Sequence, residues 1–153
     1  MTDNWPQADL DDVRRLRALA AGISGAAVTE RVFDKSLPEV WDLMWGDGRA
    51  FAEFQPDMRS ITRVTVDGVH VSLYARSNYG FRAHLQGIVR PGWCWLQSRF
   101  LLIGMAVAEE PDGRTRVALT GGVRIPRRPA LIPIGVRRES LKSLNRLEQL
   151  LNR

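Results

Sequence analysis

Side chains able to carry out metal or nucleophilic chemistry are few and scattered in this sequence. Its two histidines, His70 and His84, fall in different predicted strands, and no cysteine or carboxylate stands at ligand spacing beside either. A zinc site needs three or four such ligands converging on one ion. The sequence also lacks a glycine-rich phosphate loop and a nucleophile elbow. It therefore predicts no metal site, no cofactor and no catalytic residue.

Acid–base candidates for an interior cavity are equally few. A general base must lie within hydrogen-bond reach of the proton that it removes. Glu30 points inward if its strand neighbours Val28 and Val32 do. Tyr79 and Arg76 are the next candidates, although strand alternation places Arg76 on the opposite face. This shortage favours a binding protein over an enzyme.

Length and composition describe one ordinary globular domain. A chain of 153 residues, 44% of them hydrophobic, can bury a full core without disulfides or metal ions. Cys94 is the single cysteine, which rules out an intrachain disulfide and suits a reducing cytoplasm. The sequence begins without the basic and apolar regions of a secretory leader, and no stretch approaches the roughly 18 apolar residues that span a bilayer. We therefore expect a cytoplasmic protein without stable membrane insertion.

The chain is basic, with a net charge of +5, and only Lys35 and Lys142 among its 22 basic residues are lysine. The locally dense group comprises Arg124, Arg127, Arg128, Arg137 and Arg138. Elsewhere the basic residues are spread along the chain, and aromatic residues do not interleave them as in a groove for single-stranded nucleic acid. A nucleic-acid partner is therefore not expected.

Start and stop signals place the helices and the first strand. The predicted elements are a helix over residues 10–21 capped by Asp9, a strand over 28–33, a helix from the Ser36 and Glu39 capping box to residue 45, a helix over 49–54, and a final helix over 138–151. The final helix carries a leucine stripe at spacings of three and four: Leu141, Leu144, Leu147 and Leu151. Such a stripe needs an apolar partner surface.

Between residues 59 and 125 the pattern is that of strands joined by tight turns. The turns are Asp67-Gly68, Pro91-Gly92 and Pro111-Asp112-Gly113. They predict the pairs Val66 with Val69, Val64 with Val71, Val89 with Cys94, Gly87 with Leu96, Val107 with Val117, and Met105 with Leu119. Paired residues share one face of a sheet, so these registers separate a dry face from a wet face. The dry face is the partner available to the leucine stripe.

The wet face carries two tryptophans, Trp93 and Trp95, together with polar side chains. The polar members are His70, Arg76, Arg82, His84, Gln86, Gln97, Arg116 and Arg124. Two exposed tryptophans would make an unusual apolar patch on a monomer. They therefore indicate a homodimer as one alternative.

The order of strand, two short helices, six strands and long helix resembles the START-like, or polyketide cyclase/dehydrase (SRPBCC), superfamily. The likeness rests on Phe33 to Trp41, on Phe51, Phe54 and Pro56, on Gly113 to Val117, and on the final helix. It implies an α+β helix-grip fold, with a seven-stranded curved antiparallel sheet wrapped around a long C-terminal helix and two short helices after the first strand. This domain would cover residues 26–153, preceded by a tail and short helix over residues 1–25.

The predicted site is an apolar cavity between the sheet and the final helix. Small residues that would leave room in it are Ala75, Ala83, Gly87, Ala106, Ala108 and Gly121. The predicted ligand-binding residues are Trp41, Leu73, Ala75, Phe81, Leu85, Leu96, Met105, Val107, Leu119, Leu131 and Ile134. We expect such a cavity to bind or carry a hydrophobic small molecule, such as a lipid, an isoprenoid or a polyketide-like compound.

Two alternative functions stay open. The resemblance to aromatase/cyclases implies action on a polyketide, with Glu30, Tyr79 and Arg76 as the polar candidates. A ligand-free interaction module would instead use the arginine-rich segment near residues 124–138 or the two outward tryptophans.

Overall fold

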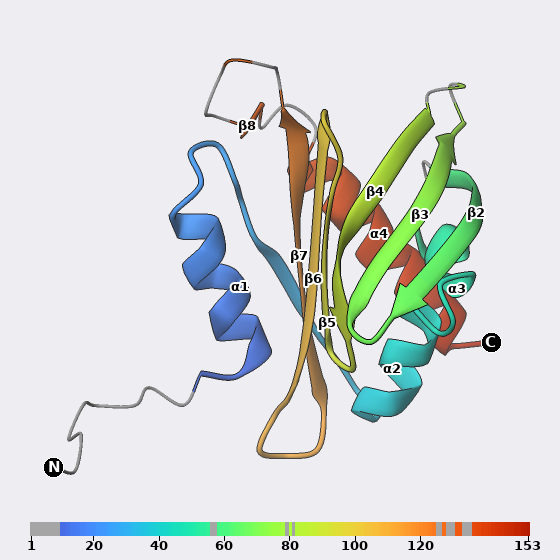
Figure 1. Cartoon of the computed structure of the whole chain (residues 1–153). Helices are drawn as coiled ribbons and strands as arrows, with labels where there is room; N and C mark the ends of the chain where they lie inside the picture. Colours follow the sequence, from blue (N-terminus) through green and yellow to red (C-terminus); the bar gives the residue numbers. More distant parts are fainter. Residues whose placement is uncertain are drawn as a thin grey trace, which may run out of the picture.

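A computed structural model describes residues 10–55, 58–78, 80, 82–124, 127, 131–132 and 136–153. Its elements are α1 (Asp12–Ala21), β1 (Thr29–Phe33), α2 (Leu37–Met44), α3 (Ala50–Phe54), β2 (Met58–Asp67), β3 (His70–Ser77), β4 (Arg82–Arg90), β5 (Trp93–Gln97), β6 (Leu101–Glu109), β7 (Thr115–Arg124), β8 (Leu131–Ile132) and α4 (Val136–Leu151) (Figure 1). The predictions that concern Asp9, Tyr79, Phe81, Arg128 and Ile134 lie outside the described residues.

The strands form one antiparallel sheet in the order β1-β7-β6-β5-β4-β3-β2, and the two-residue β8 pairs with β7. Figure 1 shows this sheet curving around α4, with α2 and α3 at its lower end. The predicted helix-grip fold is confirmed. α2 begins at the predicted cap, where the Ser36 hydroxyl accepts a hydrogen bond from the Glu39 amide at 3.4 Å. α1 begins two residues later than predicted, because Asp11 caps it and accepts a hydrogen bond from the Arg14 amide at 2.8 Å.

Two of the three predicted turns have the predicted register. Val89 pairs with Cys94, and Met105 pairs with Leu119. The register predicted for the β2–β3 hairpin is wrong, because the two-residue loop lies one residue further along the chain than predicted. Asp67 pairs with His70, and Gly68 takes the first loop position with a φ of 62°. A glycine with positive φ at the first loop position is typical of a type II′ turn, which competes with the type I′ turn that Asp-Gly predicts.

The main core lies between the concave face of the sheet and helices α2, α3 and α4. Leu85, Leu96 and Leu119 point into it, as the strand alternation predicts. Phe51 and Phe54 of α3 fill its lower end. The stripe of α4 faces the same core: Leu144 and Leu147 are buried in it and Leu151 packs against it, whereas Leu141 is exposed.

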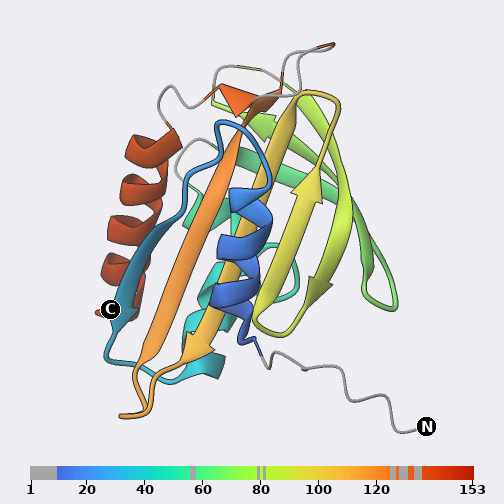
Figure 2. The same ribbon diagram turned by 90° about the vertical axis from the view of Figure 1, so that its left-hand side faces the viewer.

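A second, smaller core lies on the other face of the sheet, under α1. Figure 2 shows α1 lying across the outer face, where it contacts β6 and β7. Val13 and Leu16 of α1 pack there with Trp93 and with the small side chains of Ala106, Ala108 and Ala118. The alanines at 106 and 108 therefore make room for a helix and not for a ligand.

This second core corrects the prediction of an exposed tryptophan patch. Trp93 is 8% exposed because α1 covers it, and Trp95 is half-buried beside it. The two rings stack with centroids 6.4 Å apart. The argument for a homodimer rested on their exposure, and α1 occupies that surface.

Ion pairs join the start and the middle of α1 to the sheet. Arg90 donates two hydrogen bonds to Asp12, at 2.6 and 2.8 Å, and lies over the Trp93 ring. In the middle of the helix Arg17 donates to both oxygens of Glu30, at 2.5 and 2.6 Å. A helix joined to the sheet by one apolar patch and two bidentate ion pairs is an integral part of the fold.

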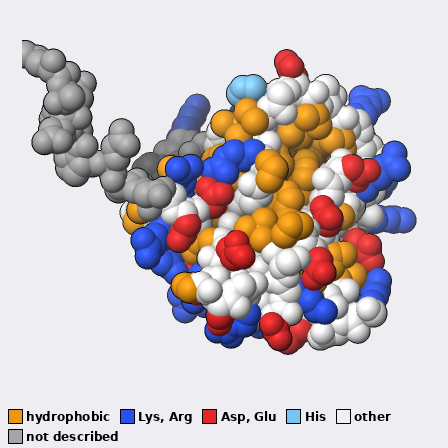
Figure 3. Space-filling view, turned by 90° about the horizontal axis from the view of Figure 1, so that it is seen from below, with side chains coloured by type: hydrophobic (Ala, Val, Ile, Leu, Met, Phe, Trp, Pro, Cys, Tyr) orange, Lys and Arg blue, Asp and Glu red, His pale blue; other side chains and the backbone are white. Residues whose placement is uncertain are grey.

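The lower end of the molecule carries both signs of charge. Seen from below, hydrophobic side chains occupy the centre of this end, with acidic and basic side chains around them (Figure 3). The β6–β7 turn reaches this end, and there Asp112 accepts a hydrogen bond from Arg114 at 2.7 Å. Among the helices that the structure describes, none is long and apolar enough to cross a membrane.

Candidate functional site

A cavity of about 1200 Å³ lies between the concave face of the sheet and the start of α4, at the upper end of the molecule. Its apolar walls comprise Met58, Ala75, Ala83, Leu101, Ile103 and Leu119. Ala75 and Ala83 pair across β3 and β4, one step beyond the larger pair Leu73 and Leu85. The core is filled where the leucines pair, and it is open where the alanines pair.

The sheet itself has a gap beside this cavity. β5 ends at Gln97, which pairs with Gln86, so the first part of β4 has no described partner strand on that side. β6 begins at Leu101 across the gap. The cavity reaches through this opening, because its lining includes inner-face Leu119 and outer-face His84.

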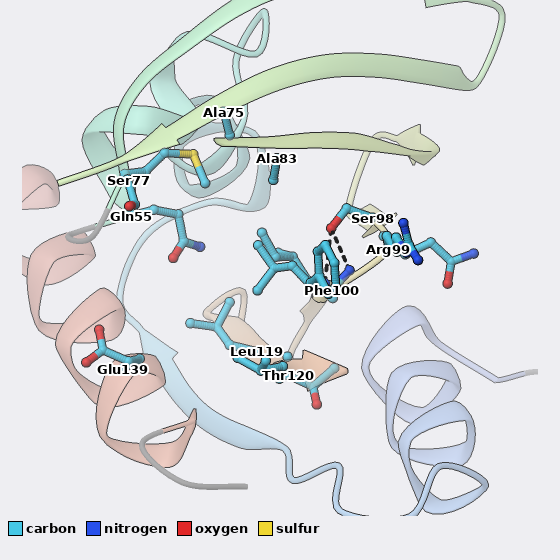
Figure 4. Close-up of a pocket in the computed structure, with 18 of the residues that line it drawn as sticks. Gln55, Ala75, Ser77, Ala83, Ser98, Arg99, Phe100, Leu119, Thr120 and Glu139 are labelled. Carbon is cyan, nitrogen blue, oxygen red and sulfur yellow. Dashed lines mark hydrogen bonds between the residues drawn. The ribbon is translucent and has the colours of Figure 1, made fainter. Parts of the chain in front are cut away.

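A short turn borders the gap. The Ser98 hydroxyl accepts hydrogen bonds from the amides of Phe100 and Leu101, at 3.2 and 3.0 Å. Phe100 at the tip is 53% exposed, and the Arg99 guanidinium lies 5.5 Å from its ring centroid. Figure 4 shows these residues on one side of the cavity and Glu139 of α4 on the opposite side.

The polar rim of the gap is defined by five side chains. They are Arg82, His84 and Gln86 of β4, Gln97 of β5 and Arg99 of the turn. His84 is held in place, because its Nε2 lies 2.7 Å from the Ser72 hydroxyl and its ring stacks on Tyr74 at 4.4 Å. The rim places hydrogen-bond donors where the cavity meets solvent.

A second polar group lies on the helix side of the cavity. Ser143 donates a hydrogen bond to the Gln55 side-chain oxygen at 3.2 Å, and the Gln55 amide nitrogen lies 3.9 Å from the Met105 sulfur. Ser140 and Ser143 are both buried on α4. They share a helix face with Leu144 and Leu147, and that spacing was the signal from which the sequence could have predicted them.

The predicted ligand-binding residues separate into those at the cavity and those in the packed core. Ala75 and Leu119 line the cavity. Those buried in the packed core are Trp41, Leu73, Leu85, Leu96, Met105 and Val107. The backbone of Leu131 pairs in β8, while Phe81 and Ile134 lie outside the described residues. Ligand contact by these residues stays a prediction.

The inward orientation predicted for Glu30 is wrong. Its carboxylate lies on the outer face, bound by Arg17 and 3.5 Å from Arg116. The hydrogen bonds from Arg17 hold the pKa of Glu30 below its usual range. A carboxylate ionised and engaged outside the sheet cannot act as a base in the cavity. Arg76, a further polar candidate, is exposed.

The cavity wall nevertheless includes one acidic residue, Glu139. One of its oxygens accepts a hydrogen bond from Lys142 at 3.2 Å. Within the described part of the chain, no group of three or more His, Cys, Asp or Glu side chains comes together as a metal site would require.

Comparison with solved structures finds the same fold in proteins of distant sequence. A protein from Mesorhizobium loti, MLL2253, superimposes with a TM-score of 0.61 at 13% identity, over 83% of this chain and 96% of that one. The Zhui aromatase/cyclase from Streptomyces has a TM-score of 0.54 at 10% identity, over 80% and 86% of the two chains. A START superfamily protein from Mycobacterium smegmatis has a TM-score of 0.50 at 13% identity, over 82% and 93%.

No family model matches the sequence, and no curated protein matches it. The structural likeness therefore shows a shared fold. This protein has the START-like helix-grip fold, with a cavity at the upper end of the sheet.

Proposed function

We propose that the protein binds or carries a hydrophobic small molecule, such as a lipid, an isoprenoid or a polyketide-like compound. The observation that supports this function best is the cavity of about 1200 Å³ with largely apolar walls. Pockets for small molecules are typically apolar with a few polar groups that orient the ligand. The serines of α4 and the polar rim supply such groups here.

The two alternative functions have less support. The base predicted for a polyketide cyclase, Glu30, lies outside the cavity in an ion pair, and the acidic residue that lines the cavity, Glu139, is ion-paired with Lys142. A ligand-free interaction module would not need an interior cavity. Cys94 is buried and has no second cysteine to pair with, which suits a reducing compartment, and we propose that the protein acts in the cytoplasm.

Two measurements test the binding function. Purified protein is extracted with organic solvent and analysed by mass spectrometry, and binding of Nile red is measured on the delipidated protein. We expect a co-purified hydrophobic compound and saturable dye binding. Absence of both would overturn the proposal.

A substitution that fills the cavity tests its location. Ala83 lines the cavity and is half-buried, so Ala83→Trp should displace the ligand and the dye. Ala18→Trp is the matched control, because Ala18 is exposed on α1. Circular dichroism checks that both variants are folded. Equal dye binding by folded Ala83→Trp and Ala18→Trp would place the site elsewhere.

A further inference from the structure

We propose that the ligand is an amphiphile with an anionic group, a carboxylate or a phosphate, that binds Arg82 and Arg99 at the polar rim. This inference rests on the proposed function, and it specifies the chemical class of the molecule that fills the cavity. The apolar part of the ligand would lie against Ala75, Ala83 and Leu119.

The first support is that neither rim arginine has a carboxylate partner among the residues that the structure describes. Many arginines of the fold have a carboxylate partner, as Arg17 has in Glu30 and Arg90 has in Asp12, whereas some exposed ones outside the cavity have none. Arg82 and Arg99 form no ion pair with any described residue, although both line the cavity. Their positive charge therefore remains available to a ligand.

The second support is the chemistry of the whole rim. Guanidinium and amide groups from β4, β5 and the Ser98–Phe100 turn all offer hydrogen-bond donors to one opening. No acidic side chain belongs to the polar rim. Guanidinium groups bind carboxylate and phosphate oxygens in matching geometry, and such charge-assisted hydrogen bonds are roughly twice as strong as neutral ones.

The position of Glu139 supports one orientation of the ligand. It lies on α4, across the cavity from Arg99 (Figure 4), and Lys142 contacts it. An anionic group is attracted to the arginines on the rim side, whereas the helix side offers the ion pair of Glu139 with Lys142. The hydroxyl of Ser140, which lines the cavity on the helix side, would suit an uncharged polar atom of the ligand.

Desolvation explains why the charge matters. When an apolar ligand fills the opening, it removes water from the guanidinium groups around it. A partly desolvated charge without a partner is unfavourable, and an anionic group on the ligand offsets that cost. An uncharged ligand with the same apolar part lacks this compensation and should bind more weakly.

The test compares ligands that share one hydrocarbon chain. Oleate, oleoyl lysophosphatidate and oleyl alcohol compete with Nile red on delipidated protein, each below its critical micelle concentration. One or two charge-assisted hydrogen bonds predict that the anionic ligands bind about 10-fold or more tightly than the alcohol. The relative affinities of oleate and lysophosphatidate distinguish a carboxylate from a phosphate, and tight binding of either supports the inference.

Variants assign the preference to the rim. Arg82→Gln with Arg99→Gln should remove the preference for anions, because it weakens the binding of oleate and lysophosphatidate and removes the desolvation cost that oleyl alcohol pays. Arg59→Gln with Arg137→Gln is the control, because these exposed arginines form no described ion pair and lie outside the cavity lining, yet their removal changes the net charge equally. The control variant should keep the preference of the unaltered protein.

The outcomes separate this inference from the proposed function. Equal affinities for oleate, lysophosphatidate and oleyl alcohol would overturn the anionic ligand and leave hydrophobic binding standing. A preference lost equally in both double variants would also overturn it, because general positive charge would then explain the effect. Failure of the dye and all three ligands to bind would overturn the proposed function itself.

Discussion

Replacing Leu16 with alanine tests whether α1 is bound to the sheet as tightly as its contacts indicate. Leu16 is 0% exposed and packs in the second core with Trp93. Full burial of a leucine contributes about 1.5–3 kcal/mol, and Leu→Ala in a packed site costs about 2–5 kcal/mol. Because this core is small and open at its edges, we expect a loss near the lower limit, about 2.5 kcal/mol.

Urea unfolding followed by tryptophan fluorescence measures that loss, and far-UV circular dichroism follows the helices. For a chain of this length, about 2.5 kcal/mol corresponds to a fall in Tm on the order of 5–10 °C. Leu19→Ala is the control on the same helix, because Leu19 is 46% exposed and alanine is as good a helix former as leucine. If Leu16→Ala costs no more than Leu19→Ala, α1 does not bind the sheet as described.

Three further substitutions or treatments follow from the contacts. Burial raises the pKa of the Cys94 thiol, so iodoacetamide should label it only after unfolding, and rapid labelling of native protein would contradict its burial. Arg17 lowers the pKa of Glu30, so Glu30 stabilises the fold above its unfolded pKa, about 4.3, and this contribution is lost as pH falls through the folded value. Glu30→Gln should therefore cost about 1 kcal/mol at pH 7 and less at pH 3, and an equal cost at both would refute the ion pair as the cause. Gly104→Ala should cost about 1–3 kcal/mol in urea unfolding, because its Cβ would lie 2.7 Å from the Thr120 methyl group, and a neutral result would show that the methyl group can move.

Strand parity predicted which face of the sheet Leu96, Leu119 and Trp93 occupy, but not what covers that face. Leu96 and Leu119 lie inside as expected, because the Pro91-Gly92 and Pro111-Asp112-Gly113 turns set their registers. Trp93 also lies on its predicted face. Its burial was missed because α1 lies outside the part of the chain that resembles the START-like pattern.

The position of the cavity could not be predicted for a related reason. Leu73 and Ala75 lie on the same strand and face, yet only Ala75 lines the cavity. Which end of a curved sheet is left open depends on where α3 and α4 place their side chains. That arrangement is a property of the assembled helices, and alternation within one strand carries no information about it.

The early end of β5 has a consequence for how the opening beside the cavity can vary in size. The opening in the sheet exists because one strand stops at Gln97 while its neighbours continue. Lengthening that strand by a residue or two beyond Gln97 would narrow the opening and leave the Leu85 and Leu96 core untouched. The size of the opening and the packing of the core thus depend on separate parts of the molecule, and variation in one short turn can alter the first without changing the second.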